Sequence, residues 1–236
     1  MAGEFEAIQR AVVRCTKCPE LRSYCKQVAA EKKRAYRDWT YWGKPVPAFG
    51  DSDARVMLVG LAPGAHGSNR TGRMFTGDAS GDFLYPALHR AGFASHATAV
   101  SADDGMVLRD CVITAALRCA PPQNKPTPDE LKRCYPYLLR EMEVLTNVRV
   151  IVGLGLIGTK AAIGALKDSG FTIEPRVWKF GHGIEIAARN GKREITVIAS
   201  FHPSRQNTNT GKLTAPMFDA IFTRARELIG TNAATT

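Results

Sequence analysis

The stretch RVIVGLGLIGTKAAIGALKDSG, Arg149 to Gly170, is the plainest strand-to-helix unit in this 236-residue chain. Its first part, RVIVGLG, is a short apolar run of the kind found in buried strands. The remainder, LIGTKAAIGALKDSG, predicts a helix that stops at Gly170, because glycine readily terminates helices. A strand that leads directly into a helix is the repeating unit of α/β folds.

The same alternation occurs upstream. RVMLVG (55–60) and DCVITAALR (110–118) predict two more strands. Between them, SGDFLYPALHRAGF (80–93) predicts a helix with Ser80 as its N-cap. A second helix is predicted for TPDELKRCYPYLLREMEVL (127–145), which opens with a capping box from Thr127 to Glu130 and has Pro128 at its first position.

Downstream, IEIAARNGKREITVIAS (184–200) predicts a β-hairpin that turns at Asn190-Gly191, and APMFDAIFTRARELIG (215–230) predicts a last amphipathic helix. We therefore expect an α/β fold, a three-layer sandwich with a central, mostly parallel sheet flanked by helices. Residues 1–230 are expected to form a single domain, with residues 231–236 as a disordered tail.

Composition indicates the partner and the compartment. The net charge of +10 favours a polyanion such as nucleic acid. The first segment, MAGEFEAIQR, is polar and does not resemble a signal peptide, and no apolar run is long enough to span a membrane. We expect a cytoplasmic protein, in which the six cysteines are thiols or metal ligands rather than disulfides.

Ligands of open α/β sheets bind at the carboxyl ends of the strands, so the loops that follow strands are the candidate sites. Four loops qualify: 61–81, 119–125, 154–159 and 201–212. The third contains GLGLIG (153–158), a literal dinucleotide fingerprint with Glu174 further on. It does not open the fold, however, and we favour the alternative that its small residues let a helix pack closely on the sheet.

The cysteines form a more specific pattern. Cys15 and Cys18 make a CxxC on an N-terminal helical arm, while Cys119 follows a strand and Cys134 lies on the capped helix. Four thiolates hold either zinc or an iron–sulfur cluster, and the wide spacing of the second pair favours a cluster. The other two, Cys25 and Cys111, are expected to be small buried side chains.

Two basic segments suit a nucleic acid. In residues 32–42, lysines and arginines alternate with Tyr36, Trp39 and Trp42, which either stack on bases or pack against the core. In the fourth loop, His202 precedes a polar run that begins at Arg205, and amide-rich loops suit groove edges and phosphates.

The loop from Gly60 to Gly81 is rich in glycine but contains no phosphate-binding motif. Four segments, GLAPGAHG, GRMFTGDASGDFL, CAPPQNKPTPDE and HPSRQNTNTG, resemble in this order the motifs of the iron–sulfur uracil-DNA glycosylases, and within them of family 5. The cysteine pattern is similar as well. The resemblance extends from about Cys15 to the last helix.

This resemblance implies an enzyme that flips uracil or another damaged base out of double-stranded DNA and hydrolyses its N-glycosidic bond. In this reaction the resemblance implies that Asp78 orients the attacking water and stabilises the cationic sugar. His202 would donate a hydrogen bond to the oxygen of the leaving base. The base would lie against bare backbone and an aromatic ring. The residues of this pocket are Gly60, Ala62, Gly64, Phe75 and Ala115.

The resemblance also implies a [4Fe-4S] cluster on Cys15, Cys18, Cys119 and Cys134, and no obligate protein partner. DNA contacts are expected from the loop that carries Arg205, Gln206, Asn207 and Asn209. A helix N-cap is the alternative role of Asp78, and a structural role that of His202.

Two departures from the related glycosylases have different consequences. The segment Leu61-Ala62-Pro63 has no acid, which leaves catalysis to Asp78, and Ala115 stands where relatives carry an asparagine that reads uracil, which predicts broad base selection. The rival functions are a non-catalytic lesion-binding protein of the same fold and a nucleotide-dependent oxidoreductase that uses GLGLIG.

Overall fold

The computed structural model describes residues 2–191 and 193–230, so the predicted tail, 231–236, lies outside the described residues. In the described part, one sheet has the strand order β1-β3-β2-β4-β7-β6-β5. Its strands are β1 (Phe49–Gly50), β2 (Val56–Gly60), β3 (Cys111–Ala115), β4 (Val150–Leu154), β5 (Thr172–Glu174), β6 (Glu185–Asn190) and β7 (Arg193–Ser200).

The centre of the sheet is parallel and its edges are antiparallel. Strands β3, β2, β4 and β7 run in parallel, while β1, β6 and β5 pair in antiparallel fashion. The four central strands are buried almost throughout, as expected for strands covered on both faces. The predicted hairpin is present, with Asn190 paired to Arg193 and Gly191 in the turn.

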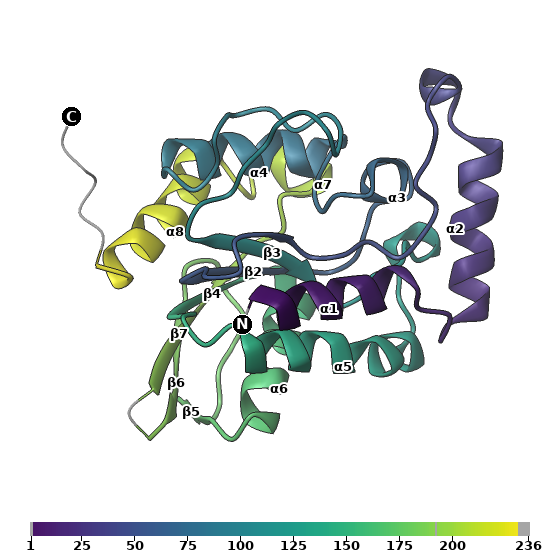
Figure 1. Ribbon diagram of the computed structural model, residues 1–236. Coiled ribbons are helices and arrows are strands. Elements are labelled where there is room, and N and C mark those ends of the chain that lie inside the picture. Colours follow the sequence, from purple (N-terminus) through teal and green to yellow (C-terminus); the bar gives the residue numbers. More distant parts are fainter. Residues whose placement is uncertain (1, 192, 231–236) are drawn as a thin grey trace.

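Helices cover both faces of the sheet (Figure 1). On one face, α4 (Ala79–Arg90) and α8 (Ala215–Leu228) pack on a core that includes Leu84 and Phe218. On the other face lie α1 (Ala2–Val13), α5 (Pro128–Val144) and α6 (Gly155–Asp168). The three-layer α/β sandwich predicted from the sequence is therefore confirmed.

The remaining helices are α2 (Pro19–Glu31), α3 (Ser68–Thr71) and α7 (Arg205–Asn209), with short 3-10 turns at Arg34–Tyr36 and Pro122–Asn124. The helix predicted at 127–145 begins as expected, with the reciprocal Thr127–Glu130 capping box and Pro128 in its first turn. The N-cap of α4 is different from the prediction. It is Asp78 rather than Ser80, because the helix begins at Ala79.

No helix within residues 2–191 and 193–230 is both long and apolar enough to cross a membrane. The chain turns back across β2 after β3, since β3 and β4 lie on opposite sides of that strand. The end of β2 is thus a point at which strand order reverses, and crevices of this kind bind ligands in α/β sheets. The glycine-rich loop, residues 61–78, begins there.

Candidate active site and cysteine cavity

The catalytic mouth, as we call the region around Asp78, Phe75 and His202, is built from the ends of three strands. Phe75 comes from the loop after β2, and His202 follows β7. Their ring centroids lie 5.9 Å apart with the planes tilted by 32°. The end of β4 joins them, because a Cβ atom on Gly155 would lie 3.3 Å from Cβ of His202. The structure thus brings together the aromatic ring and the histidine predicted from separate loops.

The carboxylate of Asp78 uses its two oxygens differently. Oδ1 accepts hydrogen bonds from the backbone N–H groups of Ser80 (3.0 Å) and Gly81 (3.1 Å), so Asp78 does cap α4. Oδ2 has no hydrogen-bond partner in the described chain and faces the glycine-rich loop. Burial raises the pKa of this carboxyl, and the two backbone donors oppose that effect. One oxygen fixes the side chain while the other is free for a ligand.

The glycines of the loop make room for this carboxylate. A Cβ atom on Gly67 would lie 1.9 Å from Asp78 Oδ2, and one on Gly64 would lie 2.8 Å from it. Both distances are well below any real contact of two such atoms. The bare backbone of the loop therefore makes room for the acid, while the base-binding role expected from the sequence stays a prediction.

Phe75 lies against the end of β2. A Cβ atom on Gly60 would meet the tip of the Phe75 ring at 2.8 Å. Phe75 has a φ of 52°, which is unusual for a bulky residue and recurs at functional sites. Ala115 pairs with Gly60 in the sheet and is 1% exposed, within the same core cluster as Phe75. Gly60, Phe75 and Ala115 are thus neighbours, as the predicted pocket requires.

His202 is held through its backbone. Its carbonyl oxygen accepts bonds from the backbone N–H of Ser204 (2.8 Å) and from Nδ2 of Asn207 (2.9 Å). Burial lowers the pKa of His202 to about 4, so the imidazole is neutral at physiological pH. Neither ring nitrogen has a hydrogen-bond partner among the residues that the structure describes. A neutral imidazole can donate one N–H to a ligand.

The predicted DNA-binding loop is a one-turn helix, α7, capped by the side chain of Ser204. Arg205, Gln206 and Asn209 are exposed on it. Asn207 is only half-exposed, and its amide nitrogen is already bonded to the carbonyl of His202. The structure therefore gives Asn207 a positioning contact in place of a free surface amide.

The aromatic residues Tyr36, Trp39 and Trp42 of segment 32–42 are half-buried and contact the glycine-rich loop. The guanidinium carbon of Arg70 lies 3.9 Å from the Tyr36 ring centroid and 4.1 Å from that of Trp39. The ring of Trp42 packs on Gly72, where a Cβ atom would be only 2.9 Å away. These contacts agree with the packing alternative, while stacking of these rings on bases stays a prediction.

Arg70 is a site residue that the sequence did not reveal. It is 3% exposed, and it donates from Nε to the carbonyl of His66 (2.8 Å) and from Nη2 to the carbonyl of Gly77 (2.7 Å). Its positive charge also opposes the rise in the pKa of Asp78. Arg70 therefore fastens the loop immediately before the carboxylate.

The cysteine cavity is a second site, lined by Cys15, Cys18, Cys119 and Cys134. These side chains come from the α1–α2 connection, the segment after β3, and α5. Lys17, Arg22, Arg118 and Arg133 line it too. No three metal-binding side chains of the described residues converge closely enough to hold a single metal ion. Four thiols in a cavity rich in cations suit an anionic group of several atoms.

Burial strongly affects these thiols. It raises the pKa of Cys18, and it raises that of Cys134 to about 12. The pKa of Cys119 is raised by a hydrogen bond with Cys25 and by burial. Protonated thiols in an apolar cavity become metal ligands only when a bound cation displaces their protons.

The two remaining cysteines lie outside the cavity lining. Cys111 is fully buried in β3, as predicted. Cys25 is fully buried too, and its sulfur lies 3.6 Å from the carbonyl oxygen of Ala120. Because Cys25 also hydrogen-bonds with Cys119, it is a neighbour of the four cavity cysteines rather than an isolated apolar side chain.

GLGLIG is explained by packing. A Cβ atom on Gly158 would lie 2.2 Å from the carbonyl oxygen of Val59, and one on Gly153 would lie 2.4 Å from Oγ1 of Thr159. These glycines let α6 approach the sheet. Leu156 and Ile157, in contrast, are 41% and 37% exposed, beside the Gly155 contact with His202.

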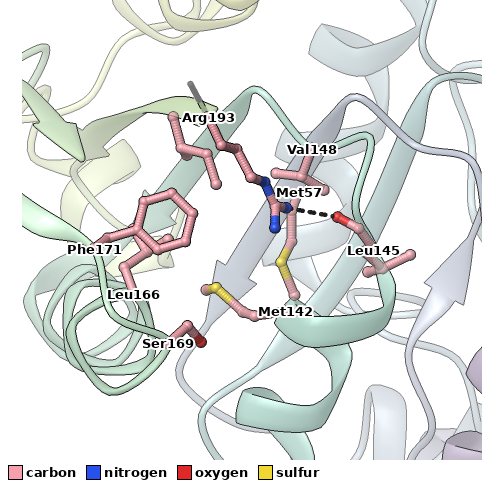
Figure 2. Close-up of a pocket in the computed structure, with 9 residues that line it drawn as sticks. Met57, Met142, Leu145, Val148, Leu166, Ser169, Phe171 and Arg193 are labelled. Atoms are coloured by element: carbon pink, nitrogen blue, oxygen red, sulfur yellow. Dashed lines mark hydrogen bonds between the residues drawn. The ribbon is translucent and has the colours of Figure 1, made fainter. Parts of the chain in front are cut away.

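Figure 2 shows another cavity. Its lining includes Val148, just before β4, and Arg193, the first residue of β7, so it lies at the opposite end of these strands from His202, which follows β7. Arg193 lies beside the ring of Phe171 and donates to the carbonyl of Leu145 (3.1 Å), with Met57 and Met142 around it. The cavity is small and largely apolar, and none of the predicted site residues lines it.

Known proteins resemble this chain over nearly its full length. A family model described as the uracil DNA glycosylase superfamily matches residues 47–226. A type-5 uracil-DNA glycosylase from Thermus thermophilus is 46% identical over 95% of this chain and 98% of its own length. One from Mycobacterium tuberculosis is 45% identical over 97% of this chain and 83% of its own.

A type-5 relative from Pyrobaculum aerophilum is 44% identical over 94% of this chain and 92% of its own length. A type-4 enzyme from the same organism is only 32% identical, over 67% of the chain and 64% of its own length. The chain therefore belongs to the uracil-DNA glycosylase superfamily and, within it, to the type-5 uracil-DNA glycosylases. It is accordingly a DNA-repair glycosylase.

Proposed function

We propose that this glycosylase removes uracil and other deaminated or modified bases from double-stranded DNA through Asp78 and His202. The observation that supports these roles is the pair of unpartnered groups at the catalytic mouth. Oδ2 of Asp78 and the ring nitrogens of His202 have no partner in the described chain, while Oδ1 and the His202 backbone are held firmly. Firmly held groups with free polar atoms are suited to binding a transition state.

The flipped base enters between Phe75 and the backbone that follows β2. Its face stacks on the ring of Phe75, and its edge approaches the backbone from Gly60 through Ala62 to Gly64. Glycine is needed at Gly60, because any side chain there would strike the Phe75 ring.

Cleavage breaks the bond between the sugar C1′ and the base nitrogen, and both electrons of the bond leave with the base. Oδ2 of Asp78 stabilises the cationic sugar, orients a water molecule towards C1′ and takes its proton. His202 donates an N–H to the oxygen of the leaving base, where negative charge accumulates. A neutral imidazole carries one N–H, which is enough for this hydrogen bond.

The test is incubation of the protein with an oligonucleotide duplex that holds one uracil, followed by alkali to cut abasic sites. Strand breakage by the wild type and its loss in Asp78→Asn are expected. A protein that binds the duplex without creating abasic sites would instead be the non-catalytic lesion-binding alternative.

We also propose that Cys15, Cys18, Cys119 and Cys134 hold a [4Fe-4S] cluster. The convergence of the four cysteines on one cavity and the cations around it support this, since four thiolates around such a cluster carry net negative charge. When bound, the cluster supplies a structural tie between the α1–α2 connection, the segment after β3 and α5. Iron analysis of the purified protein tests this, with about four irons per chain expected. One zinc per chain would be the contrary result.

Two finer roles complete the proposal. Ala115 has no polar group that could hydrogen-bond to the edge of the base and distinguish one base from another, so several damaged bases are accepted. Arg205, Gln206 and Asn209 on the exposed side of α7 contact the DNA backbone and groove, and the positioned Asn207 keeps α7 next to His202.

A further inference from the structure

Arg118 is a buried cation at the wall of the cysteine cavity. It follows the end of β3, is 1% exposed and lines the cavity with the four cysteines. Its Nη2 pairs with the carboxylate of Glu141. Its other two nitrogens, Nε and Nη1, are buried and have no hydrogen-bond partner within the described residues.

Two buried guanidinium nitrogens without hydrogen-bond partners lower the stability of a folded protein. A buried charged donor without a partner loses its hydration and gains nothing in return, so native structures nearly always satisfy such groups. Arg118 and the four cysteines line one cavity, and the sulfur atoms of iron–sulfur clusters accept hydrogen bonds.

We propose that Arg118 donates hydrogen bonds from Nε and Nη1 to the sulfur atoms of the [4Fe-4S] cluster, and that it thereby raises the reduction potential of the cluster. This inference rests on the cluster proposed above. Reduction adds a negative charge to the cluster, and a buried cation with two donors stabilises the reduced form more than the oxidised form.

Glu141 sets the strength of this effect. It is fully buried and accepts from Nε2 of Gln9 (2.9 Å), from Oγ1 of Thr114 (2.7 Å) and from Arg118. These contacts fix the guanidinium in place, and the carboxylate offsets part of its charge. Arg118 and Glu141 should therefore shift the potential of the cluster in opposite directions.

Redox titration of the purified iron-loaded protein, followed by electron paramagnetic resonance, tests the proposal. Arg118→Gln is expected to lower the equilibrium constant for reduction at least tenfold, which is 59 mV for one electron. Glu141→Gln is expected to raise the potential, because the cation then acts without its counter-charge. Arg133→Gln is the matched control: Arg133 also lines the cavity and bonds Cys18 but is exposed, so water screens its charge and the shift should be smaller.

Equal potentials in Arg118→Gln and the wild type, at equal iron content, would overturn the role of Arg118 while leaving the cluster in place. Wild-type protein without iron would overturn the cluster itself. If Arg118→Gln does not fold or loses its iron, Glu141→Gln decides: an unchanged or lower potential in that variant refutes the proposal.

Discussion

Arg73, near the catalytic mouth, and Arg118, at the cysteine cavity, are almost equally buried but differ in their partners. The guanidinium of Arg73 is fully used: Nε bonds Thr76 (2.9 Å), and Nη1 and Nη2 bond the two oxygens of Asp104 at 2.7 and 2.6 Å. Arg118 has one partner for its side chain and two unpartnered nitrogens. The chain itself supplies hydrogen-bond partners for every guanidinium nitrogen of Arg73, but for only one of those of Arg118.

The difference extends to the regions around the two arginines. At the catalytic mouth, the loop is fixed by caps, by glycine contacts and by Arg70, so its free groups are held in place before substrate arrives. In the cysteine cavity, four thiols and four cations surround a space without an acid among its lining residues. We infer that mutations at the mouth change chemistry with little loss of stability, whereas mutations in the cavity change stability first.

The largest expected effect is in the cavity, for Cys119→Ala. Loss of this ligand should release the iron. The α1–α2 connection, the segment after β3 and α5 would then no longer be linked through the cluster. The free energy of unfolding should fall by more than about 4 kcal/mol, in the range that loss of a metal site produces. Iron analysis and denaturant unfolding measure both quantities.

Cys111→Ala and Cys25→Ala are the controls. Both residues are buried cysteines outside the cavity lining, so both variants should retain the iron. Loss of iron from Cys25→Ala would show that Cys25, which bonds Cys119, belongs to the ligand set.

At the mouth, Asp78→Asn separates capping from catalysis. Asparagine caps helices as well as aspartate does, so the bonds to Ser80 and Gly81 can persist and the stability should hardly change. Without the carboxylate charge, the single-turnover rate constant should fall by about a hundredfold or more, with DNA affinity little altered. His202→Ala should behave similarly in rate. A stability loss that matches the loss of rate would favour the purely structural roles.

The strand and helix order was predictable because its signals are local. The Thr127–Glu130 capping box and the apolar run at 150–154 specify their elements within a few residues. The N-cap of α4 was mispredicted because Asp78 and Ser80 are both good caps, and in the structure the backbone N–H groups of Ser80 and Gly81 bond to Asp78, so the helix begins directly after it. Gly81 also lies close to Phe75. A Cβ atom on Gly81 would lie 1.8 Å from the carbonyl oxygen of Phe75.

The site was predictable only in part, because its supporting contacts are distant in sequence. Asp78 and His202 could be chosen from the motifs, and the structure brings their loops together. The contacts of Arg70 with the rings of Tyr36 and Trp39 join segments about thirty residues apart. The partner of Arg118 lies on α5, so a sequence that reads ITAALRC gives no sign that this arginine is buried.

Arg70→Met should have the next largest effect at the mouth. Methionine keeps much of the buried volume but removes the bonds to His66 and Gly77 and the charge near Asp78. The rate should fall about tenfold. Burial already raises the pKa of Asp78, and loss of the cation should raise it further, so the acid limb of the single-turnover pH profile should move to higher pH.

The neutral plateau of that profile should remain, because His202, with its pKa near 4, does not titrate there. Arg37→Met is the control, since Arg37 is exposed on the same segment as Tyr36 and Trp39. An unmoved acid limb in Arg70→Met would remove the electrostatic role of Arg70 and leave only its packing.

Ala115→Asn should narrow base selection. Ala115 is 1% exposed and pairs with Gly60, so an amide at this position would lie at the end of β3 beside the pocket. A buried amide that pairs with uracil rejects bases whose donors and acceptors do not match. Activity on hypoxanthine should fall at least about tenfold relative to uracil in duplexes of otherwise equal sequence. Strict uracil specificity already present in the wild type would refute the role of Ala115.

The smallest expected effect is that of Arg205→Ala on binding to DNA. Arg205 is exposed at the start of α7, two residues before the Asn207 that bonds to the His202 carbonyl, so α7 can touch DNA only where the mouth does. If Arg205 neutralises one phosphate, its removal should reduce the slope of log affinity against log salt by about 0.9, equally for duplexes with and without uracil. Arg189→Ala supplies the comparison, because Arg189 is also exposed but already pairs with Glu174 on β5 and Glu194 on β7. An equal slope in Arg205→Ala and Arg189→Ala would mean that α7 only supports His202. A change confined to Arg205→Ala would mean that the same short helix both holds the catalytic histidine and fixes the DNA against it.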